Sequence, residues 1–436
     1  MKKIFITILA SVSLYSAAFA QIPDLPVFYR APLSYHFPTR KVDDKVTHID
    51  FRYSEGSTNN SRNSSDKKTH LFNEHGSTSL KNIALNVEGV TSGGAKNTTY
   101  QKFYAGDEIA ELYDGTVAFT GDFKTKQYDF TLNQNLKWGF YLQAHIPIRN
   151  VKIKNIGYVH TVTTESEQTI IDSFIANDLD TVLADNDLKP FQTVFSREEV
   201  SDSLISLGWH GYDTKSWGVI DSLRGLIQIG AVCPLSSRRP KDHVFAIGTG
   251  YENHWGVNMQ MQAHITLWKK LMFGIAANST ILLKETYECR MVTSADQNGW
   301  IVLEKGYAEV DPGSVWRIGG YVGTDRLFGG FSAMAGYSYA KRESSYLSVR
   351  DTNFLQTAAL ADSYLSKDTI VNTDKRLKGW YHHTLHFMAE YNVEAHTDGV
   401  FAPRISVFYD MPLTGQYIWT TEMIGGTLGA QISWRF

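Results

Sequence analysis

The sequence has 436 residues, and its 42 basic side chains nearly balance 45 acidic ones, so the formal net charge is −3. That balance gives no reason to expect a nucleic-acid partner, which would favour a basic surface. Neither the two cysteines nor the 14 histidines show metal-site spacing, and there is no glycine-rich phosphate loop. We therefore expect no metal, no cofactor and no catalytic residue.

The N-terminus has the pattern of a secretory signal peptide. It begins Met-Lys-Lys, continues with an apolar run over residues 4–18 and reaches a small-residue site at Ala18-Phe19-Ala20. We expect cleavage after Ala20, which removes residues 1–20 on export and leaves residues 21–45 as a short periplasmic segment. No later stretch has the roughly 18 consecutive apolar residues of a membrane-spanning helix.

Alternating strand patterns follow. Residues 257–268 read VNMQMQAHITLW and alternate apolar and polar side chains. Such alternation predicts a β-strand with one apolar and one polar face. In a soluble sandwich the apolar face is the core, whereas in a membrane barrel it meets lipid and the polar face lines the lumen. This strand alone leaves both alternatives open.

Residues 46–436 contain twelve segments that we predict to be strands. They are 46–57, 115–132, 137–153, 203–212, 219–235, 256–267, 272–290, 314–325, 330–344, 380–394, 403–411 and 424–436. Their links alternate between short turns and longer loops, which is typical of the periplasmic and outer sides of outer-membrane barrels. A fourteen-strand barrel is an alternative, because 80–89 also alternates and can pair with 98–106.

Three of the predicted outer loops are long, at 58–114, 154–202 and 345–379. A structureless loop as long as the first is unusual unless it has a function, so a plug or constriction in the lumen is one hypothesis for it. In the second, Ile171, Phe174, Ile175, Leu179, Val182 and Leu183 recur at helical spacing, which predicts an amphipathic helix. That helix either forms a lid or packs on the barrel rim.

The last predicted strand, IGGTLGAQISWRF at 424–436, alternates and ends on Phe436. It resembles the final strand of bacterial outer-membrane β-barrel proteins, which typically ends in an aromatic residue. The resemblance implies an antiparallel transmembrane barrel, an outer-membrane location and recognition of this strand by the barrel-assembly machinery. Tryptophans near predicted strand ends agree with two interfacial girdles. They are Trp138, Trp209, Trp217, Trp268 and Trp434 at one end, and Trp255, Trp316, Trp380 and Trp419 at the other.

In a barrel, the polar faces of the strands supply the lumen. The lumen-lining candidates are Arg149, Arg224, Lys284, Glu288, Arg290, Arg317, Glu390, Arg404, Arg435, Gln260, Gln262, His264 and His386. Both charge signs are present, and arginine is common, which suits carboxylate-bearing solutes through bidentate pairing. Twelve strands lie between the filled eight-stranded barrels and the open sixteen-stranded ones, so the strand number does not decide whether the lumen is open.

The leading hypothesis is a passive channel for small polar or anionic solutes. The alternative from another class is a closed structural barrel with adhesive outer loops. An outer-membrane lipid hydrolase is a minor alternative, because no outward-facing serine has a histidine at a matching position. We expect outer-membrane lipids and lipopolysaccharide as partners.

Overall fold

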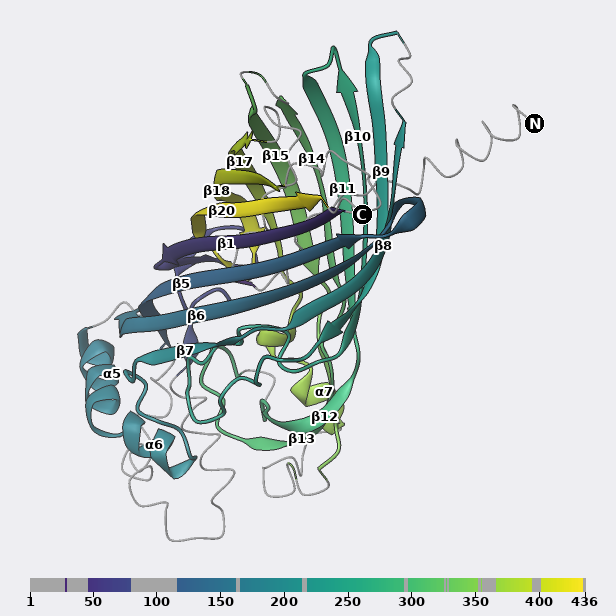
Figure 1. Cartoon of the computed structure of the whole chain (residues 1–436). Coiled ribbons are helices and arrows are strands. Elements are labelled where there is room, and N and C mark those ends of the chain that lie inside the picture. Colours follow the sequence, from purple (N-terminus) through teal and green to yellow (C-terminus); the bar gives the residue numbers. More distant parts are fainter. Residues whose placement is uncertain are drawn as a thin grey trace.

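The structure is a computed structural model that describes most of the chain. The described residues are 28–29, 46–79, 116–161, 165–213, 218–293, 297–324, 327, 329–351, 354, 366–393 and 401–433. None of the helices in these ranges is long and apolar enough to cross a membrane. Figure 1 shows long strands wrapped into one barrel, with the helices and short strands gathered at one end.

Twelve antiparallel strands form the barrel wall. They are β1 (Val46–Thr58), β5 (Thr116–Asn135), β6 (Phe140–His160), β8 (Ser203–Asp213), β9 (Ile220–Cys233), β10 (Gly256–Leu267), β11 (Leu271–Leu282), β14 (Val315–Thr324), β15 (Phe331–Arg342), β17 (Tyr381–Asn392), β18 (Phe401–Gln416) and β20 (Glu422–Ser433). The pairing of β5 with β6 closes the sheet. The predicted twelve-stranded barrel is therefore confirmed.

The fourteen-strand alternative is wrong. Strand β1 pairs directly with β5, from Thr47 opposite Gln134 to Thr58 opposite Phe123, so no hairpin from the intervening loop enters the wall between them. The residues proposed for that hairpin lie outside the described ranges. We call the two rims the short-turn end, where β10 and β11 are joined by Trp268–Lys270, and the long-loop end, where Thr58 and Glu422 lie.

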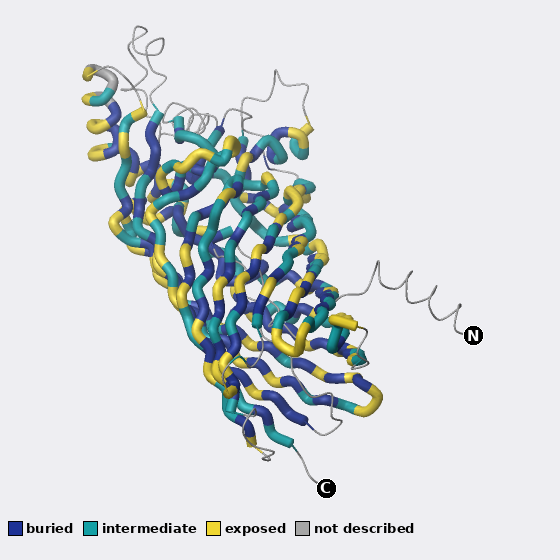
Figure 2. The backbone as a smooth tube through the Cα atoms, turned by 90° about the horizontal axis from the view of Figure 1, so that it is seen from above, coloured by how far each residue is buried: buried dark blue, intermediate teal, exposed yellow. Residues whose placement is uncertain are grey.

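The two faces of the strands divide as alternation requires. In β10, Asn258, Gln260, Gln262 and His264 are at most 2% exposed, whereas Met259 is 43% exposed. Outward residues of the neighbouring strands, such as Ile229 and Ile275, are also exposed. Figure 2 shows this alternation of buried and exposed positions along the strands. The polar face of residues 257–268 therefore points into the barrel, and the apolar face points outward.

Two tyrosines fill the interior by lying against glycines on the next strand. Tyr141 on β6 is opposite Gly208 on β8, and Tyr321 on β14 is opposite Gly274 on β11. A Cβ atom added to either glycine would lie within 2.3 Å of the facing ring. Each glycine therefore provides the space that its tyrosine ring occupies.

The long-loop end carries an apolar cap. Helices α5 (Glu165–Asn177) and α6 (Leu179–Asp185) bury the six apolar residues that predicted a helix here, and these pack with Phe72, Phe245 and Ile301 from three other loops. Phe123 of β5 and Ile153 of β6 join the same cluster, so the cap is fixed to the wall. The predicted helix is confirmed, and its apolar face packs on the rim.

Short elements complete the long-loop end. Strands β12 (Glu285–Arg290), β13 (Lys305–Asp311) and β16 (Tyr346–Val349) form a separate sheet. Strands β19 (Ile418–Trp419), β2 (Asn60–Arg62) and β3 (Lys68–His70) form another. Strands β4 (Thr78–Ser79) and β7 (Phe195–Val200) extend the edges of β5 and β6, and α7 (Lys367–Val371) packs against β16 through apolar residues such as Ile370 and Leu347.

Two residues of the expected periplasmic segment lie at the opposite end. Tyr29 is fully buried against Phe123 and Trp419, and the Phe28 carbonyl accepts a hydrogen bond from the Trp419 backbone N–H at 3.1 Å. These contacts are in the cap. An aromatic cluster thus holds Phe28 and Tyr29 at the long-loop end, and the periplasmic placement of residues 21–45 stays a prediction.

The tryptophan prediction is confirmed only in part. Trp138, Trp209 and Trp268 are exposed at the short-turn end, and Trp255 and Trp316 are exposed at the other. Trp380 and Trp419 are at most 4% exposed because they pack inside the mouth, so placing them in a girdle was wrong. Trp217 and Trp434 lie outside the described residues.

Candidate functional site

Most of the predicted lumen residues lie on inward faces of barrel strands. Each shares its strand parity with buried neighbours, and several are almost fully enclosed. They are Arg149, Arg224, Arg317, Glu390, Arg404, Gln260, Gln262, His264 and His386. Whether solute passes them stays a prediction.

Three predicted lumen residues are elsewhere, because the predicted strand 272–290 breaks after Leu282. Lys284 points away and pairs with Asp311 at 3.0 Å. Glu288 and Arg290 lie on β12, where they pair with Lys241 and with loop carbonyls. These side chains brace the loops at the long-loop end, so their assignment to the lumen was wrong. Arg435 lies outside the described residues.

The interior side chains bond extensively to one another. Arg404 makes a bidentate ion pair with Asp50, with both closest contacts at 2.6 Å. Arg149 donates through Nε to Gln127 at 3.2 Å and through Nη1 to the Thr249 carbonyl at 2.5 Å. Thr249 belongs to the loop between β9 and β10, so this loop folds inward and contacts the wall.

A chain of three side chains crosses β15, β17 and β18. Ser338 Oγ lies 2.7 Å from His386 Nε2, and His386 Nδ1 lies 2.8 Å from Asp410 Oδ1. This is the order of a nucleophile, base and acid in hydrolases. All three residues are about 1% exposed, and Ser338 lines neither of the two cavities described below, so we assign the chain to interior packing.

A cavity of approximately 170 Å³ lies at the long-loop end, beside the cap. It is built from segments far apart in the sequence, and its walls combine aromatic rings with basic side chains. The aromatic lining is Phe28, Tyr251, Tyr287, Trp300, Trp380 and Tyr417. The basic lining is Arg239, Arg290, Arg342, Arg376 and Lys378.

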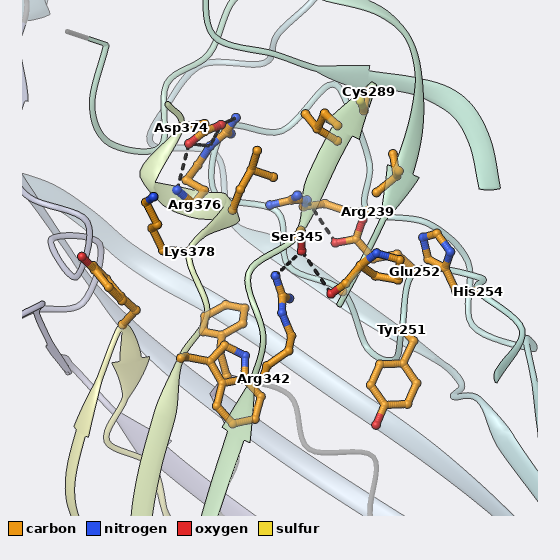
Figure 3. A pocket seen from close by; sticks show the side chains of 18 of the residues that line it. Arg239, Tyr251, Glu252, His254, Cys289, Arg342, Ser345, Asp374, Arg376 and Lys378 are labelled. Carbon is orange, nitrogen blue, oxygen red and sulfur yellow. Dashed lines mark hydrogen bonds and ion pairs between the residues drawn. The ribbon is translucent and has the colours of Figure 1, made fainter. Parts of the chain in front are cut away.

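Positive charge exceeds negative charge in this cavity. Arg376 pairs with Asp374 at 2.6 Å, and Arg239 pairs with Glu252 at 3.5 Å, which raises the pKa of Arg239. Arg342 instead donates to the Ser345 hydroxyl at 2.6 Å, and no carboxylate of a described residue is within ion-pair distance of it. Figure 3 shows Arg342 and Arg239 approaching the same space from opposite sides of Ser345.

The third carboxyl group of the cavity, that of Glu74, forms no ion pair with the arginines and is buried beneath two indole rings. It is 1% exposed, and one of its oxygens accepts hydrogen bonds from the indole N–H groups of Trp300 and Trp419, at 3.1 and 3.3 Å. Burial raises the pKa of Glu74 to about 8, so the group is mostly protonated at pH 7. The neighbouring His75 has its pKa lowered to about 3 by burial and is neutral.

The arrangement suits a small anion with an apolar portion. A carboxylate or phosphate would be attracted by the guanidinium of Arg342, and an apolar part would contact the rings. The sequence patterns did not predict this cavity. Of its lining residues only Arg290 was a candidate, and it was assigned to the barrel lumen. Most of the cavity's residues lie in loops without periodicity, and Arg342 lies at the end of β15. The available signal was the concentration of basic and aromatic residues in those loops.

The comparisons with known proteins concern overall shape. No protein-family model matches the sequence, and no curated protein is similar to it. Among solved structures, the chain is similar to an outer membrane channel from Pseudomonas putida F1, with TM-score 0.45, 8% identity, and 92% of this chain and 100% of that chain covered.

Two further similarities are weaker. The Pseudomonas putida toluene transporter TodX matches with TM-score 0.33, 8% identity, and 92% and 95% coverage of this chain and that one. OprD from Pseudomonas aeruginosa matches with TM-score 0.27, 8% identity, and 90% and 96% coverage. These neighbours are outer membrane or transport proteins rather than enzymes, and any function proposed for this barrel rests on its own residues.

Proposed function

We propose that this chain is a passive outer-membrane channel for small anionic solutes, exported with cleavage after Ala20 and oriented with the long-loop end outside. The observation that carries the proposal is the cationic and aromatic cavity at that end. Arg342 is half-buried in it and forms no ion pair with a carboxylate among the described residues, so its positive charge can attract an anion.

Below the cavity the barrel interior is packed with polar side chains. Asn258, Gln260 and His264 on β10 face inward, as do Gln143 and Gln228 on β6 and β9. Amide and imidazole groups exchange hydrogen bonds with a solute at little cost, whereas an apolar lining would exclude a charged one. The proposed route therefore runs from the cavity, past the loop at Thr249, into this amide-rich lumen.

A closed barrel is the second candidate, and the cap favours it. Apolar residues of α5, α6 and the loops cover part of the mouth, and Arg149 is hydrogen-bonded to an inward-folded loop. Conductance across a planar bilayer separates the two candidates, because a channel gives current steps and a closed barrel gives none.

The experiment is single-channel recording in planar bilayers. We expect steady conductance steps, with a reversal potential in a salt gradient that indicates preference for anions. Arg342→Gln should lower the ratio of anion to cation permeability. Arg350→Gln is the matched control, because Arg350 lies at the same end but is half exposed and paired with Glu309. A silent bilayer contradicts the channel, and equal effects of the two variants remove the cavity from its path.

A further inference from the structure

Four lysines stand together on the outer surface of the barrel. Lys124 and Lys126 are on β5, and Lys152 and Lys154 are on β6, all on the outward parity. The two strands are adjacent in the wall, as Figure 1 shows. Lys124 lies directly opposite Lys152 in the antiparallel register. Like charges in such a pair repel one another unless an opposite charge lies between them.

The residues next to this pair on the flanking strands, Ser57 of β1 and Ser196 of β7, carry no charge. In the described residues, none of the four lysines forms an ion pair. Two acids lie opposite the other two lysines, and each also accepts a hydrogen bond from a neighbouring residue. Glu55, opposite Lys126, accepts from the Tyr53 hydroxyl at 2.7 Å. Asp122, opposite Lys154, accepts from the Asn155 amide at 2.6 Å.

The lysines are at the edge of the apolar outer surface. On β5 the outward residues toward the short-turn end are Tyr128, Phe130 and Leu132, the last two nearly half exposed. On β6 the corresponding outward residues include Ile146 and Leu142, also nearly half exposed. The ammonium groups therefore follow directly after the last lipid-facing side chains, at the level where lipid head groups lie.

A groove adjoins the same lysines. It has a volume of approximately 670 Å³, and Lys124 and Lys154 line it with Arg62 and Lys68 of the β2–β3 hairpin. Arg62 is paired with Asp66 at 2.8 Å, so the lysines supply the unpaired positive charge. Two acids also line it: Asp122 and Glu422, which accepts from the Tyr409 hydroxyl at 2.6 Å. The lysines of the groove and the cluster outnumber the acids beside them by a small margin, so a modest excess of positive charge faces the membrane surface.

We propose that this surface binds the phosphate groups of a bisphosphorylated glycolipid of the lipid A class, with its acyl chains against the apolar wall below. The four ammonium groups are spread along two neighbouring strands, from Lys126 to Lys154, so they can meet two separate phosphates on one head group, whereas a phospholipid offers one. The proposal rests on the outer-membrane orientation proposed above. It does not depend on whether the lumen conducts.

The test uses the full-length protein in phosphatidylcholine nanodiscs and measures binding of bisphosphorylated lipid A. Lys124→Gln with Lys152→Gln should weaken binding at least tenfold. The control removes the same charge at the short-turn end, with Lys269→Gln and Lys270→Gln, and should change binding less than twofold. Heat-modifiable mobility on gels verifies that both variants are folded.

Two comparison lipids separate the alternatives. Monophosphorylated lipid A should bind several-fold more weakly, and phosphatidylglycerol should bind more weakly still. Equal binding of phosphatidylglycerol overturns the assignment to lipid A, and equal losses in the two double variants overturn the assignment to this surface. Because lipid A is absent from the bilayers used for conductance, a silent channel with intact lipid binding contradicts only the proposed function.

Discussion

The buried carboxyl group of Glu74 makes the stability of the long-loop end depend on pH. Its pKa is raised from 4.5 to about 8, and each pKa unit corresponds to about 1.4 kcal/mol. The difference corresponds to roughly 5 kcal/mol in the free energy of unfolding. Because the pKa is raised in the folded state, the stability is fully present below pH 4.5 and is lost as the pH rises through 8.

Glu74→Gln keeps an acceptor for Trp300 and Trp419 but cannot ionise. We expect the variant and the parent to be similarly stable at pH 5, and the variant to be more stable at pH 9 by up to this amount. The stability that neutral His75 contributes is lost as the pH falls from 6.5 toward 3. Because His75 is present in both proteins, this loss cancels when their free energies of unfolding are compared.

The measurement is urea unfolding in detergent, followed by tryptophan fluorescence at pH 5, 7 and 9. Trp300 and Trp419 donate directly to the Glu74 carboxyl group, so their emission reports on its surroundings. Glu309→Gln, at a surface carboxylate paired with Arg350, is the control and should give no pH-dependent difference. The reasoning is refuted if Glu74→Gln differs from the parent by the same amount at all three pH values.

Three further predictions concern the barrel interior. Arg404→Gln leaves Asp50 buried without its bidentate partner and should cost about 3–5 kcal/mol in vesicle unfolding experiments, with part recovered by adding Asp50→Asn. Gly274→Ala places a Cβ atom 2.2 Å from the facing tyrosine ring and should cost about 1–3 kcal/mol, whereas Gly225→Ala, where nothing lies within 4 Å, should be close to neutral. A fluorophosphonate probe should not label the folded protein, because Ser338 is enclosed; labelling that Ser338→Ala abolishes would show a reactive nucleophile instead.

The barrel could be predicted because the pattern that identifies each strand lies within about ten consecutive residues. Alternation within ten residues identifies a strand and its two faces, as in VNMQMQAHITLW, and the lengths of the links give the order of the strands. The prediction of strand 272–290 was wrong for the same reason. Alternation continues past Leu282, but the chain turns out of the wall there because β12 pairs with β13.

The cavity and the cap were not predictable from periodicity. Glu74, Arg239, Arg342 and Trp419 come together only after the barrel closes and the loops fold onto its rim. Phe28 and Tyr29 illustrate the same limit, since their partners are hundreds of residues away. Helices α5 and α6 are the exception in the loops, because their packing face repeats at helical spacing.

The two tyrosine–glycine pairs bear on how the strands find their alignment. A shift of one residue between neighbouring strands would turn every inward side chain toward lipid, and a shift of two would keep the faces but move each ring onto a different neighbour. For Tyr321, the residues two positions either side of Gly274 are Met272 and Ala276, and both carry a Cβ atom. In the observed alignment the ring faces a residue without a Cβ atom, which neither shifted alignment provides. The two pairs therefore favour the observed register over a shift of two residues.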